Sequence, residues 1–491
     1  MQVMTLKTRL ADKDRQRFFF AFLAGKMLGL IGACAAIFTI GPWFMGTVAH
    51  ALAPGADDIQ TQVTGVVNGL NTAWTLIAAF LVFFMQAGFM MLEAGFSRTR
   101  EVVNVLLECI VDTCLCALLF WAFGFALMFG VGNSFIGHSF FFLHGATATY
   151  TFGGSFDTGV AFMAFFLFQF AFADTCSTIT SGAMVGRTGF VGDLIYSVGV
   201  SGFIYPIIGH WIWGPGGFLQ TAHNGVWLRD FAGSTVVHTV GGIIALVGAI
   251  VLGPRLGRKF KSEGGGLPAG HDLTIAAVGG VILWFGWYGF NPGSTLSAID
   301  AAGIGRVATN TTLAAAAGGM VAMFLVYPRS KKWDVGITIN GFLGGLVAIT
   351  APCYWVSPVG AVATGAIGAV VVVYGIDFIE WLKIDDPIGA VAVHGFAGIF
   401  GTWAVGLFAT GQYADFKGLF YGGGTKQLWA QVWGNGLVVI VTIVVSFILF
   451  YAVKATGTLR VSEEGELEGI DIHEHGSPAY HPESAYMGRG L

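Results

Sequence analysis

The sequence predicts an all-α polytopic membrane protein. Of its 491 residues, 55% are hydrophobic and only 11% are charged. Many apolar runs exceed about 18 residues, the length at which a helix can cross a bilayer. Glycine occurs 74 times without a collagen-like period, and small residues allow membrane helices to pack closely. A soluble globular protein could not bury this much apolar surface, so a membrane-embedded helical bundle is the predicted class.

The first 53 residues have the order of charges that is typical of a secretory signal peptide. Residues 1–17 are basic, and an apolar run from Phe18 to about Ala53 ends in AHALA. We expect cleavage there. An uncleaved anchor helix is the alternative, because the run is long and Pro54 follows it. The remaining chain divides into a membrane domain at 54–452 and a polar tail at 453–491, which is either disordered or a docking segment.

The membrane domain is predicted to contain eleven spans, each an apolar stretch bounded by polar or glycine-rich residues. Helices of about 20 residues satisfy every backbone hydrogen bond inside the bilayer. The spans centre on residues 72–96, 102–131, 158–183, 189–212, 232–253, 273–293, 308–327, 334–352, 358–376, 388–410 and 430–452.

The basic residues between the spans predict the orientation. With the first span running from outside to inside, the inside loops and tail carry 14 Lys and Arg and the outside loops carry 4. Basic residues concentrate on the inside, so an outside N-terminus and an inside C-terminus are expected. We expect a multi-pass protein of the cell membrane (inner or plasma membrane). No basic cluster suggests binding to nucleic acid.

Two histidines fall inside predicted spans. His238 lies in the fifth span and His394 in the tenth, and each is followed four residues later by glycine. Because these two spans are five apart in the chain, they cross the membrane in opposite directions. This is the arrangement of an inverted repeat of five plus five helices with one more helix at the end. Ionisable groups in a membrane usually face a cavity or pathway. The alternative is that each histidine is a polar residue hydrogen-bonded between packed helices.

Several residues near the outer ends of spans are candidates for a vestibule. Trp213 fits an interfacial belt residue, with a cation–π wall as the alternative. Pro292 breaks the sixth span and leaves Ser294 free to offer a polar atom. Asp230 fits a cap at the start of the fifth span, and it could also favour a nearby cation.

Some functions are excluded by missing patterns. No phosphate-binding GxxxxGK[ST] motif occurs, so the chain is not itself an ATP-driven pump. The six cysteines form no CxxC pair, and neither zinc spacing nor a nucleophile elbow is present. We therefore expect no enzyme activity, no cofactor and no metal site.

Three stretches together resemble the ammonium transporter family (Amt/Mep, relatives of the Rhesus proteins). They are DFAGSTVVH from Asp230, GWYGFNPGS from Gly286 and DDPIGAVAVHG from Asp385. The tail 460–480 is also similar, so the resemblance covers about residues 69–480. It favours the Amt branch and implies an eleven-helix protomer in a homotrimer with one pore per subunit. Residues 54–452 would form the ammonium channel domain and 453–491 a cytoplasmic regulatory tail.

The resemblance also implies roles for pore residues. His238 and His394 match twin pore histidines, where a proton relay is the implied role. Phe172 and Phe290 match two stacked phenylalanines that close the pore mouth.

The outer site is implied in the same way. Trp213, Phe172 and Ser294 match the site that recruits ammonium, and Asp230 matches an acid with a structural role near the vestibule. Gly186 departs from the family, which commonly has Glu before the following Arg. That departure concerns the ion pairs of an inner loop and not the pore.

The implied function is ammonium transport. Ammonium would be recruited outside and deprotonated, and ammonia would cross a hydrophobic pore. We favour net charge transfer over passive flow of ammonia gas. A sensor that signals through a partner protein is the rival function, and methylammonium is an alternative substrate. For the tail, the resemblance implies regulation by a PII-type (GlnK-like) signal protein.

Overall fold

The computed structural model describes residues 59–154, 156–220 and 226–480. The predicted signal peptide or anchor at 1–53 lies outside them. The chain divides into a unit ending at Thr64 and a unit that begins at Gly65. Every contact discussed below is within the second unit.

The second unit is a bundle of long helices, and the predicted membrane class is confirmed. Ten described segments are long and apolar enough to cross a membrane, and α12 is a shorter apolar helix. All eleven predicted spans coincide with helices in the predicted order. The helices are α3 (Ile59–Phe96), α4 (Val102–Leu119), α5 (Phe125–Phe129), α6 (Phe162–Gly182), α7 (Phe190–Gly199), α8 (Tyr205–Trp213), α9 (Val240–Leu252), α10 (Leu273–Phe290), α11 (Ala301–Ser330), α12 (Val335–Thr350), α13 (Pro358–Trp381), α14 (Ala397–Phe408) and α15 (Lys426–Ala455).

Four spans contain a π-helical turn. Two of these turns, Phe120–Gly124 and Val200–Ile204, join α4 to α5 and α7 to α8. The other two, Ser234–Thr239 and Val391–Phe396, begin the spans that continue as α9 and α14. π-Helical turns are rare and occur frequently at functional sites. The last two carry His238 and His394.

Two glycines allow these histidine-bearing segments to touch through their backbones. A Cβ atom on Gly242 would lie 2.1 Å from the backbone nitrogen of Gly395. A Cβ atom on Gly398 would lie 2.6 Å from the carbonyl oxygen of Ser234. Glycine four residues after each histidine therefore marks the place where the two segments cross.

A small β-hairpin precedes α6 and was not predicted. Its second strand includes residues 158–161, which the sequence had assigned to the start of the third span. Its strands β1 (Thr149–Phe152) and β2 (Phe156–Ala161) pair antiparallel, with Thr151 opposite Asp157. The hairpin brings Phe152 and Phe156 to the outer cavity described below.

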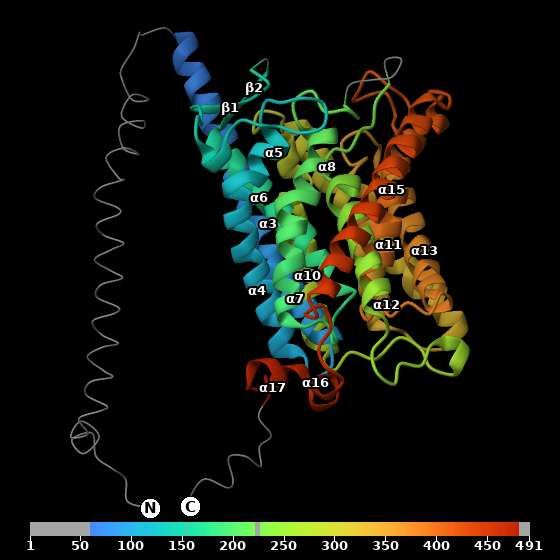
Figure 1. Cartoon of the computed structure of the whole chain (residues 1–491). Coiled ribbons are helices and arrows are strands. Elements are labelled where there is room, and N and C mark those ends of the chain that lie inside the picture. The colour runs from blue at the N-terminus through green and yellow to red at the C-terminus, as the bar shows by residue number, and fades with distance from the viewer. Residues whose placement is uncertain (1–58, 155, 221–225, 481–491) are drawn as a thin grey trace, which may run out of the picture. The chain divides into compact units, whose positions relative to one another are not determined.

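The described part of the tail packs against the bundle. Two short helices, α16 (Glu463–Glu468) and α17 (Ile470–His475), lie at the end where α4 and α7 begin (Figure 1). Asp471 Oδ1 accepts a hydrogen bond of 2.9 Å from the backbone N–H of Asn104. Glu474 Oε2 accepts one of 2.8 Å from Phe190. Carboxylates at helix N-termini are favoured, so these two hydrogen bonds hold α17 against the first turns of α4 and α7.

A buried ion-pair network closes the same end of the bundle. Arg255 Nε and Arg258 Nε donate to Asp385 over 2.8 and 3.0 Å. Burial by itself would raise the pKa of Asp385, but hydrogen bonds from Arg255 and the charge of Arg187 hold that pKa well below its usual range. The carboxylate thus stays ionised and paired.

Gly186 now has a structural explanation. Its φ of +84° is unfavourable for other residues, and a Cβ atom there would lie 2.6 Å from Glu101 Oε1. Glu101, which pairs with Arg98, occupies the space that a side chain at position 186 would enter.

Candidate functional site

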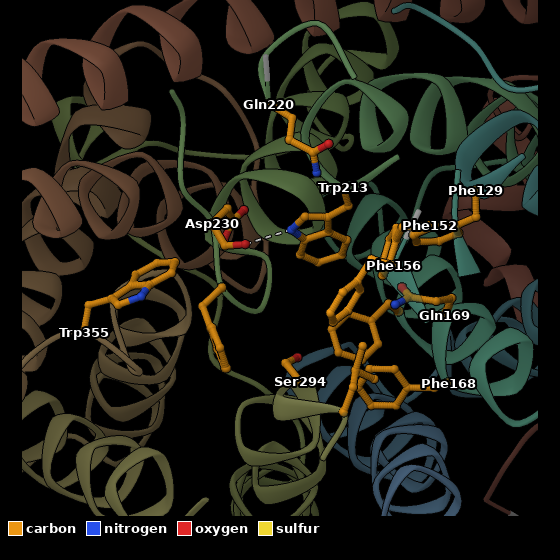
Figure 2. A pocket seen from close by; sticks show the side chains of 13 residues that line it. Phe129, Phe152, Phe156, Phe168, Gln169, Trp213, Gln220, Asp230, Ser294 and Trp355 are labelled. Atoms are coloured by element: carbon orange, nitrogen blue, oxygen red, sulfur yellow. Dashed lines mark hydrogen bonds between the residues drawn. The ribbon is translucent and has the colours of Figure 1, made fainter. Parts of the chain in front are cut away.

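An aromatic cavity of about 420 Å³ opens at one end of the bundle. Figure 2 shows Trp213, Ser294, Phe168 and Gln169 around it, with Asp230 to the side. Phe172 also lines it. The structure thus places the four residues predicted for the vestibule in one cavity.

Two polar groups of this cavity are held in place by hydrogen bonds to the backbone. Trp213 Nε1 donates a hydrogen bond of 2.7 Å to the backbone carbonyl of Asp230 (Figure 2), so the indole ring is fixed. Ser294 Oγ donates over 2.8 Å to the carbonyl of Phe290. With its proton engaged, the serine oxygen can only accept from a ligand in the cavity.

Phe172, which lines the cavity, stacks on Phe290. The ring centroids of Phe172 and Phe290 lie 4.0 Å apart with an interplanar angle of 25°. Both side chains are buried. Trp213 contacts Phe172 edge to face at 6.0 Å. The stacked pair separates the aromatic cavity from the centre of the bundle.

The two histidines meet directly beneath the stack. Nδ1 of His238 and Nδ1 of His394 lie 3.2 Å apart, and the His238 ring centroid is 5.4 Å from that of Phe290. A shared hydrogen bond requires one Nδ1 to carry a proton and the other to be bare. His238 Nε2 has no hydrogen-bond partner within the described residues.

Two equivalent modules hold the histidines. Asp230 precedes His238 by eight residues and Asp386 precedes His394 by eight, and each has a glycine of positive φ three residues after it. Asp230 accepts hydrogen bonds from the backbone N–H groups of residues 233–236. Asp386 accepts from those of residues 389–391. Each aspartate therefore caps the π-helical turn that carries its histidine.

These caps are charged at neutral pH. Burial raises the pKa of Asp230 to about 6, and hydrogen bonds from backbone N–H groups limit this rise. The same opposition gives Asp386 a pKa of about 6. Ionised carboxylates make stronger hydrogen bonds to backbone N–H groups than neutral acceptors do, so both turns are firmly anchored.

The column continues below the histidines through two smaller cavities. One of about 20 Å³ is lined by His394, Phe89, Glu93 and Asn340. The other, of about 230 Å³, shares Asn340 with it. The aromatic cavity, the phenylalanine stack, the histidine pair and these two cavities thus follow one another through the bundle.

Some residues of this column were missed in the sequence. Asp386 could have been found from its spacing to His394, which repeats that of Asp230 to His238. Trp287, whose ring lies 5.2 Å from His238, gave no such signal among 14 tryptophans. Gln169 and Glu93 are polar residues among others in largely apolar helices, and only the fold shows that they face cavities.

Comparison with known proteins connects this geometry to a family. Residues 73–480 match the model of the Ammonium Transporter Family. The chain is 44% identical over 434 residues to ammonium transporter Amt2 of Archaeoglobus fulgidus, covering 84% of this chain and 88% of that protein. It is 37% identical to ammonium transporter 1 member 3 of Solanum lycopersicum, covering 84% and 94%.

Solved structures agree with the sequence comparison. A structure titled Sensor Amt Protein superposes with a TM-score of 0.75 at 35% identity, covering 84% of this chain and 99% of that one. Mep2 of Candida albicans superposes with a TM-score of 0.72 at 27% identity, covering 80% and 86%. This chain belongs to the ammonium transporter family, a family of multi-pass membrane channels and transporters rather than enzymes.

Proposed function

We propose that this protein carries ammonium across the cell membrane by separating it into ammonia and a proton. The observation that carries the proposal is the column itself, in which an aromatic cavity, a phenylalanine stack and a hydrogen-bonded histidine pair are aligned. Each part suits one step of such a process.

The aromatic cavity is the proposed recruitment site. The ring faces of Trp213 and Phe172 attract a small cation, and the Ser294 oxygen is free to accept a hydrogen bond. Ammonium can donate such a bond, whereas potassium, which is similar in size, cannot. The site therefore favours a cation with directed N–H groups, and methylammonium is a second substrate that it could accept.

Deprotonation is the proposed selectivity step. A bare ion in the apolar column would lose its hydration, at a cost of several kcal/mol or more. Neutral ammonia avoids this cost, while potassium and sodium have no proton to lose. Phe172 and Phe290 act as a gate through which ammonia passes, and the column beneath rejects ions.

The histidine pair is the proposed proton relay. A bare Nδ1 beside a protonated Nδ1 can accept a proton while its partner releases one. Transport through such a pair moves net charge. A passive ammonia channel is the rival mechanism, with the histidines serving only as a polar lining.

The overall organisation follows from the same features. The two Asp–Gly–His modules support the inverted repeat of five plus five helices, and the distribution of basic residues supports an outside N-terminus and an inside C-terminus. We propose a homotrimer in the inner or plasma membrane, with 54–452 as the channel domain and 453–491 as the cytoplasmic tail. Binding of a PII-type protein should be lost when 453–491 is deleted.

Sensing through a partner protein is a second candidate function. It is supported by the likeness to the structure titled Sensor Amt Protein. A sensor of this fold would keep the recruitment site but would require a separate protein for its output.

Proteoliposomes containing the purified protein test the proposal. An ammonium pulse should produce a transient current together with uptake of ammonia into the liposomes. An equal potassium pulse should produce neither. Flux without current would establish the passive channel, and neither flux nor current would favour the sensor.

A further inference from the structure

A group of carboxyl side chains is buried beside the pore. Glu93 on α3, Glu108 and Asp112 on α4 and Asp193 on α7 are each at most 2% exposed. We call these four the α3–α4–α7 carboxyl cluster. None of them forms an ion pair with Lys or Arg within the described part of the chain. Buried charges without partners are strongly disfavoured in a membrane, so some of these four groups must hold protons while the others stay free to accept one.

The four groups are close enough to act on one another. A charge on Asp193 reaches Glu93, Glu108 and Asp112. The charges of all four also reach the buried Cys109 thiol. Tyr196 donates a hydrogen bond to Asp193, and Asp174 on α6 is the next acidic neighbour, beside Asp112.

Polar atoms that lack partners lie in and beside the cluster. Ser197 lies beside Asp112, and Asn104 lies beside Glu108, although none of these pairs meets in hydrogen-bond geometry. The side chains of Ser197 and Asn104 are at most 1% exposed. Ser197 Oγ, Asn104 Nδ2, both oxygens of Asp112 and one oxygen each of Glu108 and Asp193 make no hydrogen bond to another described residue. Such unsatisfied buried groups require a ligand.

One member of the cluster opens into the pore. Glu93 and His394 line the same cavity of about 20 Å³, which is large enough for about one water molecule. Glu93 thus shares a cavity with His394 and also lies within reach of the charge of Asp193.

The other end of the cluster lies towards the inner ends of α4 and α7. Asp193 is three residues from the first residue of α7, and Glu108 is six from the first residue of α4. Figure 1 shows α17 at this end of the bundle. The cluster therefore extends from the pore towards the surface where the tail packs.

The cluster suits protons better than a metal ion. Among the described residues, no three His, Cys, Asp or Glu side chains are grouped so that they could share a metal. A protonated carboxyl group can donate one hydrogen bond and still accept others. Carboxyl and hydroxyl groups in sequence can therefore pass a proton along.

We propose that the α3–α4–α7 carboxyl cluster is a proton exit path that branches from the pore below His394. Ammonium gives ammonia and a proton, and the histidine pair relays the proton to a water in the 20 Å³ cavity. As a water O–H bond breaks, an O–H bond forms on Glu93. Asp193 then accepts this proton, which restores the Glu93 carboxylate, and Asp193 gives the proton up to solvent at the end of the bundle where α7 begins. Ammonia continues through the 230 Å³ cavity. The inference rests on the proposed function, in which transport moves charge.

The test compares current with ammonia flux in the same proteoliposomes. Glu93→Gln keeps the shape of the side chain but cannot bind and release a proton. We expect its current per ammonia transported to fall by about tenfold or more, as for loss of a proton-transfer group. Ammonia flux, measured with a protonophore present, should be retained. Glu93→Asp should restore part of the current, and Asp193→Asn should resemble Glu93→Gln.

Glu263→Gln is the control, because Glu263 is a surface carboxylate paired with Lys383 and should leave the ratio unchanged. An unchanged ratio in both Glu93→Gln and Asp193→Asn would overturn the exit path while leaving electrogenic transport intact. An equal fall in current and flux in the folded variants would also overturn it, since that assigns Glu93 to the shape of the pore. No current in the unaltered protein would instead contradict the proposed function itself.

Discussion

Asp230 and Asp386 show how single side chains position the reactive groups of this protein. Each lies outside a span and binds the free N–H groups at the start of a π-helical turn. The histidine follows one to two turns later and meets its partner at 3.2 Å. This geometry fits the capping role that the sequence favoured for Asp230. The charge of Asp230 would act on a cation in the aromatic cavity through space.

Asp230→Asn should weaken the protein more than an ordinary cap substitution. The amide keeps the shape but loses the charge, so one oxygen can no longer accept and the other accepts less strongly. We expect a loss of about 2 kcal/mol or more in unfolding free energy, as for charge-assisted bonds in a buried site.

Thermal unfolding in detergent measures this change. Asp272→Asn is the matched control, because Asp272 caps α10 through two N–H groups at a partly exposed site. An equal effect of the two substitutions would contradict the special position of Asp230.

At the scale of elements, the two histidine-bearing segments depend on backbone contact. Gly242 and Gly398 allow this contact, and their position after each histidine was visible in the sequence. The reason for glycine at these two positions was not visible in the sequence. The close approach between α9 and the start of α14 exists only when the two segments are packed together.

Gly242→Ala should separate the histidines. The added methyl group would lie 2.1 Å from a backbone nitrogen, which cannot give way as a flexible side chain could. We expect destabilisation of about 1–3 kcal/mol, typical of overpacking, together with reduced ammonium flux.

Gly436→Ala on α15 is the control, since nothing lies within 4 Å of its Cβ position. There the substitution should raise helix stability by about 1 kcal/mol. Similar melting temperatures for the two variants would refute the contact.

Much of the helical framework could be predicted, because a bilayer imposes one length and one backbone geometry on each span. The hairpin β1–β2 could not, since its Thr- and Phe-rich strands lie in a loop on which the bilayer sets no such rule. The carboxyl cluster also escaped prediction. Glu93, Asp112 and Asp193 come from three helices, and only their packing brings the charges together.

At the scale of the whole molecule, the end of the bundle where α4 and α7 begin is held by ion pairs and by the tail. Arg255 and Arg258 both bind Asp385, and all three side chains are at most 5% exposed. Removing one partner of a buried pair leaves an uncompensated charge. This network therefore links the loop after α9 to the loop before the second histidine module.

Asp385→Asn should lower the unfolding free energy by about 3–5 kcal/mol at neutral pH. Because the folded pKa lies below the ordinary value of 3.8, the stabilisation is complete above that pH and is lost as pH falls through the folded pKa. Chemical unfolding at pH 7 and at pH 3 should therefore show a smaller difference between variant and parent in acid. A constant difference would contradict the ionised state of Asp385.

The central claim is that the histidine pair transfers the proton taken from ammonium. Ammonium-evoked and potassium-evoked currents of the parent protein and of the His238→Leu/His394→Leu variant, recorded side by side in proteoliposomes, test it most directly. We predict a current for ammonium alone in the parent protein and a loss of about 100-fold in the variant, with weaker discrimination against potassium. Full ammonium current and full selectivity in the variant would contradict this mechanism.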